Sequence, residues 1–487
     1  MASQYQELHF VLLPHLAHGH MIPMMDMARL LARRGLAVTI ITTPINAARF
    51  VSVIDRTARS GLRIELLQVP FPSAEAGLPE GCESMDSLPS RGMFKNLLLG
   101  ISMLQQPVEQ LLRRLQPHPG CIIADKNVMW ADQTAREFGI PRLVFDGTSC
   151  FSLLCTHNIV ESKVFDTVSE SEPFVVPGLT DRIVLTTAQL PASVNIGPSD
   201  IKDLRDEIRA KELAAYGVVV NTFEELEPAY ISEYRRVRGK VWCIGPVSLC
   251  NEDNLDKAER GNKSSVTDEH CLKWLDLWGP SSVIYACLGS LSQLTAPQLV
   301  ELGLGLEACG LPFIWVVRGG NESQLENWIS ESGFKERIKG RGLLIRGWAP
   351  QVLILSHPAV GGFLTHCGWN STLEGICAGL PMITWPLFAE QFYNEKFIVQ
   401  VLKIGVRLGS EVAVKWGEEE KFGVSVKREE VKQAVSQLMD EGDHDAQERR
   451  NRAADIGRRA KMAMEEGGSS YLNMTLMIED IMQQVRC

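Results

Sequence analysis

The chain has 487 residues, more than one ordinary hydrophobic core organises, and this length predicts two domains. Hydrophobic residues make up 45% and charged residues 22% of it, a composition typical of globular proteins. The net charge of −10 argues against nucleic acid or an anionic membrane surface as a partner, because both bind clusters of Lys and Arg.

No signal peptide is readable before the apolar run that starts at Phe10 and stops at Pro14. No run of about 18 apolar residues occurs, so we expect no transmembrane segment. The 12 cysteines are scattered without a C-x-x-C spacing, which favours buried thiols in a reducing compartment over a disulfide framework. We therefore expect a cytoplasmic protein, and we expect a monomer.

Short apolar runs alternate with amphipathic stretches along the chain, a pattern typical of parallel α/β sheets. Helices are predicted at Ile22–Ala32 and Met93–Leu115 in the first half. Strands of the first half are predicted at His9–Leu13, Ala37–Thr42, Arg63–Gln68, Cys121–Ala124, Arg142–Phe145 and Gly217–Asn221. Strands of the second half are predicted at Val283–Leu288, Pro312–Val317, Leu343–Arg346, Gly362–Thr365 and Met382–Trp385.

The polar stretch 251–270 is nearly free of large apolar side chains, which predicts a linker. It separates an N-terminal domain, 1–250, from a C-terminal domain, 271–467, and each is predicted to be a Rossmann-like, doubly wound sheet. The last helix, about 468–487, is amphipathic, and we expect its apolar face to pack back on the first domain. Two such domains facing across a cleft place a ligand at the carboxyl ends of both sheets.

The first strand-to-helix turn reads L-L-P-H-L-A-H-G-H and lacks the G-x-G-x-x-G of dinucleotide-binding folds. It carries His15, His18 and His20, at the edge where catalytic groups are expected. Structural histidines are the first alternative. A zinc site is the second, although no acidic residue or cysteine stands nearby to complete it. Asp125 follows a predicted buried strand, where its structural interpretation is a helix cap for the following segment, and Asp132 lies nearby.

The stretch from Trp348 to Gln391 contains a buried strand that ends at His366 and a helix that starts within C-G-W-N-S. Gly368 permits a tight turn, and the N–H groups of a helix N-terminus suit a phosphate or pyrophosphate. The alternative is purely structural, because Ser371-x-x-Glu374 has the form of a capping box.

This stretch resembles, nearly position for position, the signature box of plant secondary-product UDP-glycosyltransferases. The resemblance covers essentially the whole chain, including E-L-G-L-G-L-E at 301–307, P-F-I-W-V-V-R at 312–318 and E-E-G-G-S-S at 465–470, and is weaker around 75–95 and 150–210. It implies a GT-B fold and inverting transfer of glucose from UDP-glucose to a hydroxyl of a small lipophilic acceptor, giving a β-O-glucoside. Flavonoids, triterpenoids or steroids, and phenolic compounds all stay open as acceptors.

The resemblance also implies residue roles on the donor side. Trp348 stacks on uracil, the backbone of Ala349 with Gln351 holds the uracil edge or the ribose, and Glu374 accepts from the ribose hydroxyls. His366, Asn370 and Ser371 bind the diphosphate, with the Trp369 backbone and the Gly368 turn. Glu390 and Gln391 bind the sugar, and a glutamine at position 391 accompanies glucose. The loop of Gly289 and Ser290 approaches the phosphate or ribose.

On the acceptor side the resemblance implies that His20 is the catalytic base and Asp125 its partner carboxylate. His18 departs from the family pattern, as does Lys126-Asn127-Val128, where the family carries more apolar residues. The acceptor pocket is expected within loops 84–93, 129–130, 146–151 and 192–203. Its named candidates are Met129, Trp130, Thr148, Phe151 and Ala389.

We expect no metal and no other cofactor, since the UDP-sugar is a co-substrate. Asp443-His444-Asp445 has the D-x-D form of metal-dependent glycosyltransferases, but it lies in a charged stretch typical of a solvated loop. Two other functions share this scaffold, a UDP-sugar epimerase and a non-catalytic UDP-sugar sensor. Turnover of UDP-sugar without an acceptor distinguishes the epimerase, and the sensor is expected to lack the base.

Overall fold

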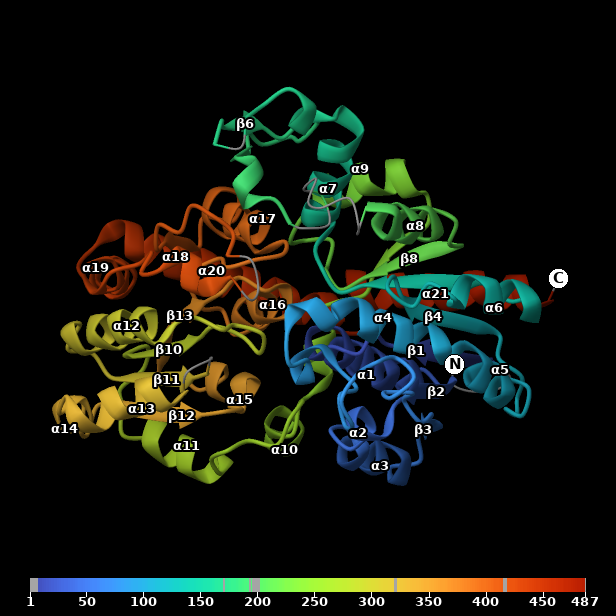
Figure 1. The fold of residues 1–487 in the computed structure, drawn as a ribbon, viewed down its shortest axis with the longest axis horizontal. Coiled ribbons are helices and arrows are strands. Elements are labelled where there is room, and N and C mark those ends of the chain that lie inside the picture. The colour runs from blue at the N-terminus through green and yellow to red at the C-terminus, as the bar shows by residue number, and fades with distance from the viewer. Residues whose placement is uncertain are drawn as a thin grey trace. The chain divides into compact units, whose positions relative to one another are not determined.

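The computed structural model describes residues 8–169, 171–191, 194, 202–318, 322–414 and 418–486 (Figure 1). The chain forms two compact units. Unit 1 comprises Met1–Cys150, Gly197–Asn262 and Met462–Cys487, and unit 2 comprises Phe151–Ile196 and Lys263–Lys461. The predicted boundaries are therefore wrong for residues 151–196, which belong to unit 2 although they lie within the first 250 residues.

Unit 1 is built on a parallel seven-stranded sheet with the order β3-β2-β1-β4-β5-β8-β9 (Figure 1). β1, β4 and β5 lie at its centre and are buried along their whole length, which explains their continuous apolar sequences. The strands are β1 His9–Leu13, β2 Ala37–Thr42, β3 Ile64–Gln68, β4 Cys121–Asp125, β5 Arg142–Asp146, β8 Gly217–Val220 and β9 Val241–Cys243.

The helices of unit 1 follow the strands. The predicted helix 93–115 is divided at Leu104 into α4, Phe94–Met103, and α5, Gln105–Leu112. The others are α1 His18–Arg33, α2 Pro44–Ala47, α3 Val51–Arg59, α6 Ala131–Phe138, α8 Lys202–Leu213, α9 Pro228–Arg238 and α10 Asn254–Ala258.

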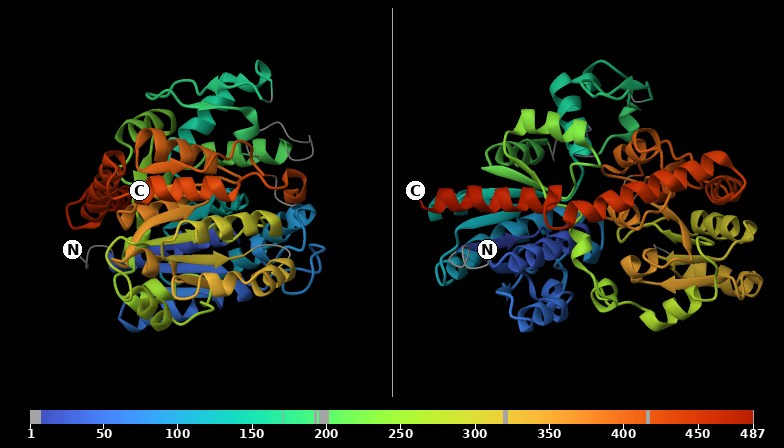
Figure 2. Two further views of the ribbon diagram at one scale, coloured as in Figure 1. Left: turned by 90° about the vertical axis from the view of Figure 1, so that its left-hand side faces the viewer. Right: turned by 180° about the vertical axis from the view of Figure 1, so that it is seen from behind.

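The C-terminal helix α21, Ser469–Arg486, is the red helix that ends near the label C in Figure 2. It belongs to unit 1 and contacts β9. Its buried face consists of Met474, Met477, Ile478 and Ile481, whereas Leu472 and Leu476 are exposed. The Arg34 guanidinium lies 3.3 Å from the centroid of the Tyr471 ring, and Lys240 Nζ lies 2.8 Å from Asp480. The helix thus combines apolar burial with a cation–π contact.

The first part of the predicted linker is an ordered part of unit 1. Asp256, in α10, pairs with the buried Arg29 and, over 2.8 Å, with Arg56. Arg260 pairs with Asp26 over 2.7 Å. Hydrophobic patterning missed this order because ion pairs, rather than apolar contacts, hold the segment.

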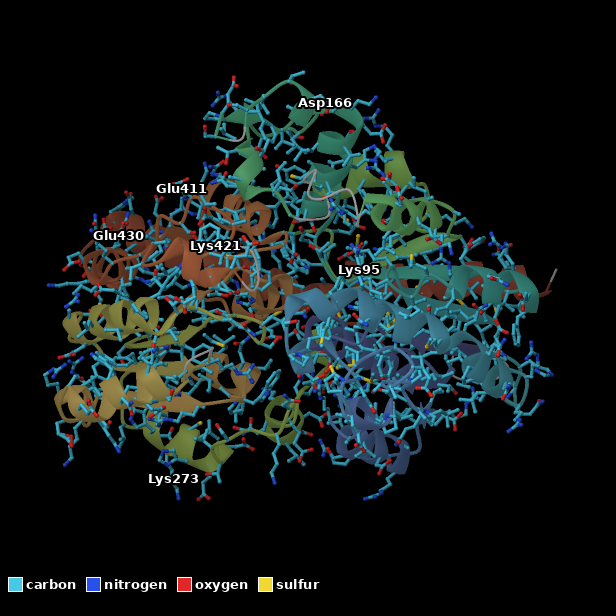
Figure 3. All side chains as sticks on the ribbon, viewed as in Figure 1. Lys95, Asp166, Lys273, Glu411, Lys421 and Glu430 are labelled. Carbon is cyan, nitrogen blue, oxygen red and sulfur yellow. The ribbon has the colours of Figure 1, made fainter. Side chains whose placement is uncertain are left out.

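Unit 2 contains a second parallel sheet, with the order β12-β11-β10-β13-β14-β15. Its core is rich in aromatic residues and includes Trp315, Phe334 and Trp385, whereas Lys273, Glu411 and Lys421 lie at its surface (Figure 3). The strands are β10 Val283–Cys287, β11 Phe313–Val317, β12 Gly342–Arg346, β13 Val360–Thr365, β14 Met382–Thr384 and β15 Gly405–Arg407, with a hairpin of β6 Phe174–Val175 and β7 Val184–Leu185.

Two helices cross the unit boundary: α7, Cys150–Ser162, starts with one residue of unit 1, and α20, His444–Met464, ends in unit 1. The other helices of unit 2 are α11 Asp268–Leu275, α12 Ala296–Ala308, α13 Glu322–Glu331, α14 Phe334–Arg337, α15 Gln351–Leu355, α16 Trp369–Cys377, α17 Gln391–Lys396, α18 Glu419–Phe422 and α19 Arg428–Met439. Among the described residues, no helix is both long enough and apolar enough to cross a membrane.

Candidate active site

His20 and Asp125 come together at the carboxyl edge of the sheet in unit 1. His20 lies in the first turn of α1, which follows β1, and Asp125 is the last residue of the neighbouring strand β4. His20 Nδ1 lies 2.6 Å from Asp125 Oδ2. A carboxylate only accepts, so Nδ1–H donates and Nε2 is left with a lone pair. The Asp125 side chain is 2% exposed and that of His20 is 36% exposed, so the imidazole is reachable.

The two residues stabilise each other's charged form. Burial lowers the pKa of His20, but the charge of Asp125 and its hydrogen bond outweigh burial and raise that pKa above its ordinary value. Burial raises the pKa of Asp125, yet the neighbouring His20 and the Asn127 N–H, 2.9 Å from Oδ1, bring that pKa far below its usual range. The pair is therefore suited to take up a proton at His20.

The competing interpretations of Asp125 are wrong. The N-cap of α6 is Trp130, so Asp125 does not cap that helix. Asp132 pairs with Arg136 over 2.8 Å, not with the histidine turn.

His15 and His18 have different surroundings from His20. His15 is buried and meets the His20 ring edge-on, with 5.1 Å between the centroids. Burial lowers the pKa of His15 to about 4, so this ring is neutral. His18 Nδ1 lies 3.2 Å from Asp86, which also pairs with Arg49 over 2.9 Å. His18 thereby ties the start of α1 to the turn η1, Met85–Ser87, which gives this departure from the family pattern a structural role.

The predicted acceptor residues differ in their exposure. Met129 and Thr148 are half-buried, and Thr148 Oγ1 is a buried atom without a hydrogen-bond partner in the described part of the chain. Trp130 is buried, lines a small apolar cavity with Leu13 and Leu16, and donates from Nε1 to the Ile101 carbonyl over 2.8 Å.

The structure corrects the prediction that Phe151 lines the acceptor pocket. Phe151 is fully buried and stacks on Phe397 within unit 2, with 5.1 Å between the centroids, so it is a core residue and we no longer expect it to line the pocket. Most of the predicted loop 192–203 lies outside the described residues.

The donor segment turns sharply between β13 and α16. Cys367 adopts a left-handed backbone with φ of 64°, and Gly368 is the N-cap of α16. Ser371 is the third residue of the helix and no side chain caps it, so the capping-box interpretation is wrong. Such strain at a non-glycine residue is common at ligand-binding turns.

His366 is packed between two glycines. A Cβ atom at Gly289 would lie 2.5 Å from His366 Nε2, and one at Gly368 would lie 2.4 Å from it. Gly289 also has a φ of 85° and precedes the half-buried Ser290. Burial lowers the pKa of His366 to about 4, so the imidazole is neutral. Its Nδ1 is buried without a hydrogen-bond partner among the described residues.

Gln351, Ser371 and Glu374 form one hydrogen-bonded cluster. Gln351 Nε2 donates to Glu374 Oε2 over 2.7 Å and to Ser371 Oγ over 3.1 Å. The Tyr285 hydroxyl, from β10, donates to Gln351 Oε1 over 3.3 Å. Sequence reasoning missed Tyr285, whose only signal is a polar group within the apolar strand V-I-Y-A-C.

Trp348 is fixed on two sides. Its carbonyl accepts from Ser265 N–H over 3.1 Å, next to the buried Ala349. The Arg318 guanidinium lies 4.9 Å from the centroid of the indole, and Arg318 Nε donates to the Gly347 carbonyl over 2.6 Å. Arg318 was also missed, although it ends the P-F-I-W-V-V-R motif that carries part of the resemblance.

Gln391 is buried and oriented by its own loop. Its Oε1 accepts from the N–H groups of Leu387 and Phe388 over 2.8 and 3.1 Å. The Nε2 amide group is therefore the part of the side chain left to donate. Ala389, with a φ of 53°, and the half-buried Glu390 precede it.

Asp443, His444 and Asp445 stand at the start of α20. The side chains of His444 and Asp445 are more than four-fifths exposed. Within the described ranges, no group of three His, Cys, Asp or Glu side chains is placed to hold a metal ion.

Known proteins match this chain over its full length. The family model described as UDP-glucoronosyl and UDP-glucosyl transferase matches residues 266–417. UDP-glycosyltransferase 73C12 of Barbarea vulgaris is 54% identical over 480 residues, which are 98% of this chain and 97% of the relative.

Two solved structures extend the comparison to the fold. That of Glycyrrhiza uralensis UGT73P12, complexed with glycyrrhetinic acid 3-O-monoglucuronide, aligns with a TM-score of 0.90 and 39% identity over 98% of this chain and 96% of its own. That of Phytolacca americana UGT2, complexed with UDP-2fluoro-glucose and pterostilbene, aligns with a TM-score of 0.76 and 28% identity over 97% of this chain and 99% of its own.

This likeness defines the class of protein, because it covers both sheets and the whole length: the chain is an enzyme, a glycosyltransferase with the GT-B fold. It belongs to the UDP-glycosyltransferase family of plants.

Proposed function

We propose that this glycosyltransferase moves glucose from UDP-glucose to a hydroxyl of a small lipophilic acceptor and inverts the anomeric centre, giving a β-O-glucoside. The observation that carries the proposal is the 2.6 Å hydrogen bond from His20 to the buried Asp125, which leaves a reachable imidazole. The complexes of relatives with UDP-2fluoro-glucose, pterostilbene and a triterpenoid glucuronide support the substrate classes.

In the proposed reaction His20 Nε2 takes the proton of the acceptor hydroxyl as that oxygen attacks the anomeric carbon. The bond from this carbon to the phosphate oxygen breaks, and UDP leaves with the electron pair. A single displacement turns an α-linked donor into a β-linked product. Asp125 holds the imidazole tautomer and stabilises the imidazolium that forms.

The donor is proposed to bind through the residues of unit 2. Trp348 would stack on uracil, and the cluster of Gln351 and Glu374 would hold the ribose hydroxyls. The diphosphate would meet the N-terminus of α16 and the neutral His366, whose uncharged ring donates one N–H. The amide of Gln391 and the carboxylate of Glu390 would bind the sugar.

The proposed reaction needs no metal, because the helix N-terminus and polar side chains meet the charge of UDP. We therefore expect excess EDTA to leave the rate nearly unchanged. Strict dependence on added Mn²⁺ or Mg²⁺ would revive the interpretation of Asp443–Asp445 as a metal motif. We also propose a cytosolic location, which the scattered cysteines support.

The deciding experiment incubates the protein with UDP-glucose and a panel of flavonoids, triterpenoids or steroids, and simple phenols, with mass spectrometry as the readout. We expect products heavier by one hexose and a β-anomeric signal by NMR. UDP-glucose consumed without acceptor, with formation of another UDP-hexose, would indicate an epimerase. Tight binding of UDP-glucose without any turnover would indicate a sensor.

A further inference from the structure

A lysine stands next to the catalytic pair. Lys126 directly follows Asp125 at the end of β4, and Asp146 is the last residue of the neighbouring strand β5. Lys126 Nζ lies 3.1 Å from Asp146 Oδ2 and 3.4 Å from Oδ1. The Lys126 side chain is 31% exposed and that of Asp146 only 4%.

At this edge the two carboxylates are covered and their nitrogen-bearing partners lie outward. Asp125 and Asp146 are almost fully covered, and they bond to the imidazole of His20 and the ammonium of Lys126 respectively. The reachable atoms belong to the His20 imidazole and the Lys126 ammonium. A molecule that approaches the base therefore meets the Nε2 lone pair of His20 and the N–H donors of Lys126 before it meets the carboxylates.

Lys126 keeps its charge. Burial lowers its pKa, but the charge of Asp146, followed by those of Glu212 and Asp125, outweighs burial and raises it. Glu212, in α8, has a raised pKa, chiefly through burial, which weakens its competition as a counter-ion of Lys126. An ammonium has three N–H donors, and the two contacts with Asp146 use at most two of them.

A purely lipophilic pocket gives no reason for this lysine, because a half-buried cation loses hydration. The family resemblance predicts more apolar residues here, so Lys126 departs from the family pattern. Thr148, two residues beyond Asp146, adds a buried hydroxyl without a partner among the described residues.

We propose that Lys126 binds a carboxylate on the acceptor, so that the preferred substrates are hydroxylated carboxylic acids. The inference rests on the proposed function and adds the substrate class. The free donor of the ammonium bonds to the carboxylate, and the acceptor is thereby held with a hydroxyl toward His20. The Coulomb attraction acts only on the ionised acid, so an ester of the same skeleton lacks it.

The test compares acids with their methyl esters: glycyrrhetinic acid and 4-hydroxyphenylacetic acid, each against its ester. We expect the wild type to favour the acid by at least about tenfold in kcat/KM, since a charge-assisted hydrogen bond contributes roughly 1.5–3 kcal/mol. Lys126→Met should abolish this preference and Lys126→Arg should keep most of it.

Lys240→Met is the matched control. It removes another Lys–Asp pair of unit 1, with Asp480 at 2.8 Å, that lies before β9, at the amino edge of the sheet. The acid-to-ester ratio of this variant should equal that of the wild type. A preference that Lys126→Met leaves intact would overturn the proposal.

Salt supplies a readout that needs no variant. The wild-type kcat/KM for the acid should fall as ionic strength rises, while that for the ester should not. Equal kcat/KM for acids and esters, or turnover of neutral acceptors alone, refutes the role of Lys126 and leaves the glucosyltransferase function standing. Absence of turnover with every acceptor refutes the proposed function itself.

Discussion

Gln351 donates its side-chain amide to Glu374 across 2.7 Å, and the Tyr285 hydroxyl donates to the carbonyl of the same Gln351 side chain. Two residues that the resemblance assigns to the nucleoside thus bond to each other, and a third residue, from β10, orients one of them. The buried Tyr285 fixes which way the Gln351 amide points, and so fixes the position of the Glu374 carboxylate.

Tyr285→Phe should weaken UDP-glucose binding about threefold to tenfold, because it removes one hydrogen bond worth roughly 0.5–1.5 kcal/mol. KM for UDP-glucose should rise while kcat changes little, since ground state and transition state lose the same contact. Calorimetric titration with UDP measures the loss directly. In a Gln351→Ala background the same substitution should have no further effect, and additive losses would place Tyr285 outside the cluster.

His20→Ala should reduce turnover by roughly 10²- to 10⁴-fold, the usual contribution of a general base, and should leave UDP affinity unchanged. Asp125→Ala should be milder or comparable, because the base stays but is poorly oriented. His15→Ala and His18→Ala serve as controls from the same turn and should keep most activity. The defect should shrink for phenols that ionise near neutral pH. Wild-type turnover of an aliphatic alcohol by His20→Ala would rule out this mechanism.

The pH profile should report the His20–Asp125 contact. The base works when neutral, and Asp125 raises the pKa of His20, so kcat/KM should rise with pH through a midpoint above the ordinary value of about 6.5. Asp125→Asn removes the charge, and the midpoint should therefore move to lower pH while the plateau falls. A midpoint that stays in place would mean that another group controls the acid limb.

Gly289→Ala should weaken UDP binding by at least about tenfold, or 1.4 kcal/mol, because the new methyl group displaces the His366 ring. Gly310→Ala is the control: Gly310 has a φ of 71° and no atom within 4 Å of a Cβ placed there. Both variants should lose about 1–2 kcal/mol of unfolding free energy through left-handed backbone strain. Only Gly289→Ala should lose UDP affinity, and equal affinities in the two variants would disprove the packing argument.

UDP-glucose should be used at least about tenfold more efficiently than UDP-galactose, which requires roughly 1.4 kcal/mol of differential transition-state binding. The buried Gln391 offers only its amide N–H groups, since its carbonyl already accepts from Leu387 and Phe388. Gln391→Glu keeps that acceptor and removes the donor, so it should erase most of the preference. Initial rates with both donors measure it, and equal rates in the wild type would remove Gln391 as the cause.

The sequence determined the strands whose patterns are local. Apolar runs of five or six residues, such as those of β1, β4 and β10, predict buried strands because periodicity acts between near neighbours. Of the three-residue strands, β14 was predicted within Met382–Trp385, whereas β9 and β15 were missed, because three positions are too few to show a periodic pattern reliably. The donor residues from 348 to 391 were also identifiable, since they follow one another along the chain and resemble a family motif.

Only the tertiary structure decided which side chains meet. His20 and Asp125 are far apart in sequence and become neighbours because β1 pairs with β4. The same folding set Tyr285 against Gln351 and Arg318 against Trp348, and it assigned Phe151 to the core of unit 2. Sheet order and packing determine which of these residues come into contact. A local sequence pattern does not predict such contacts, because the residues lie far apart along the chain.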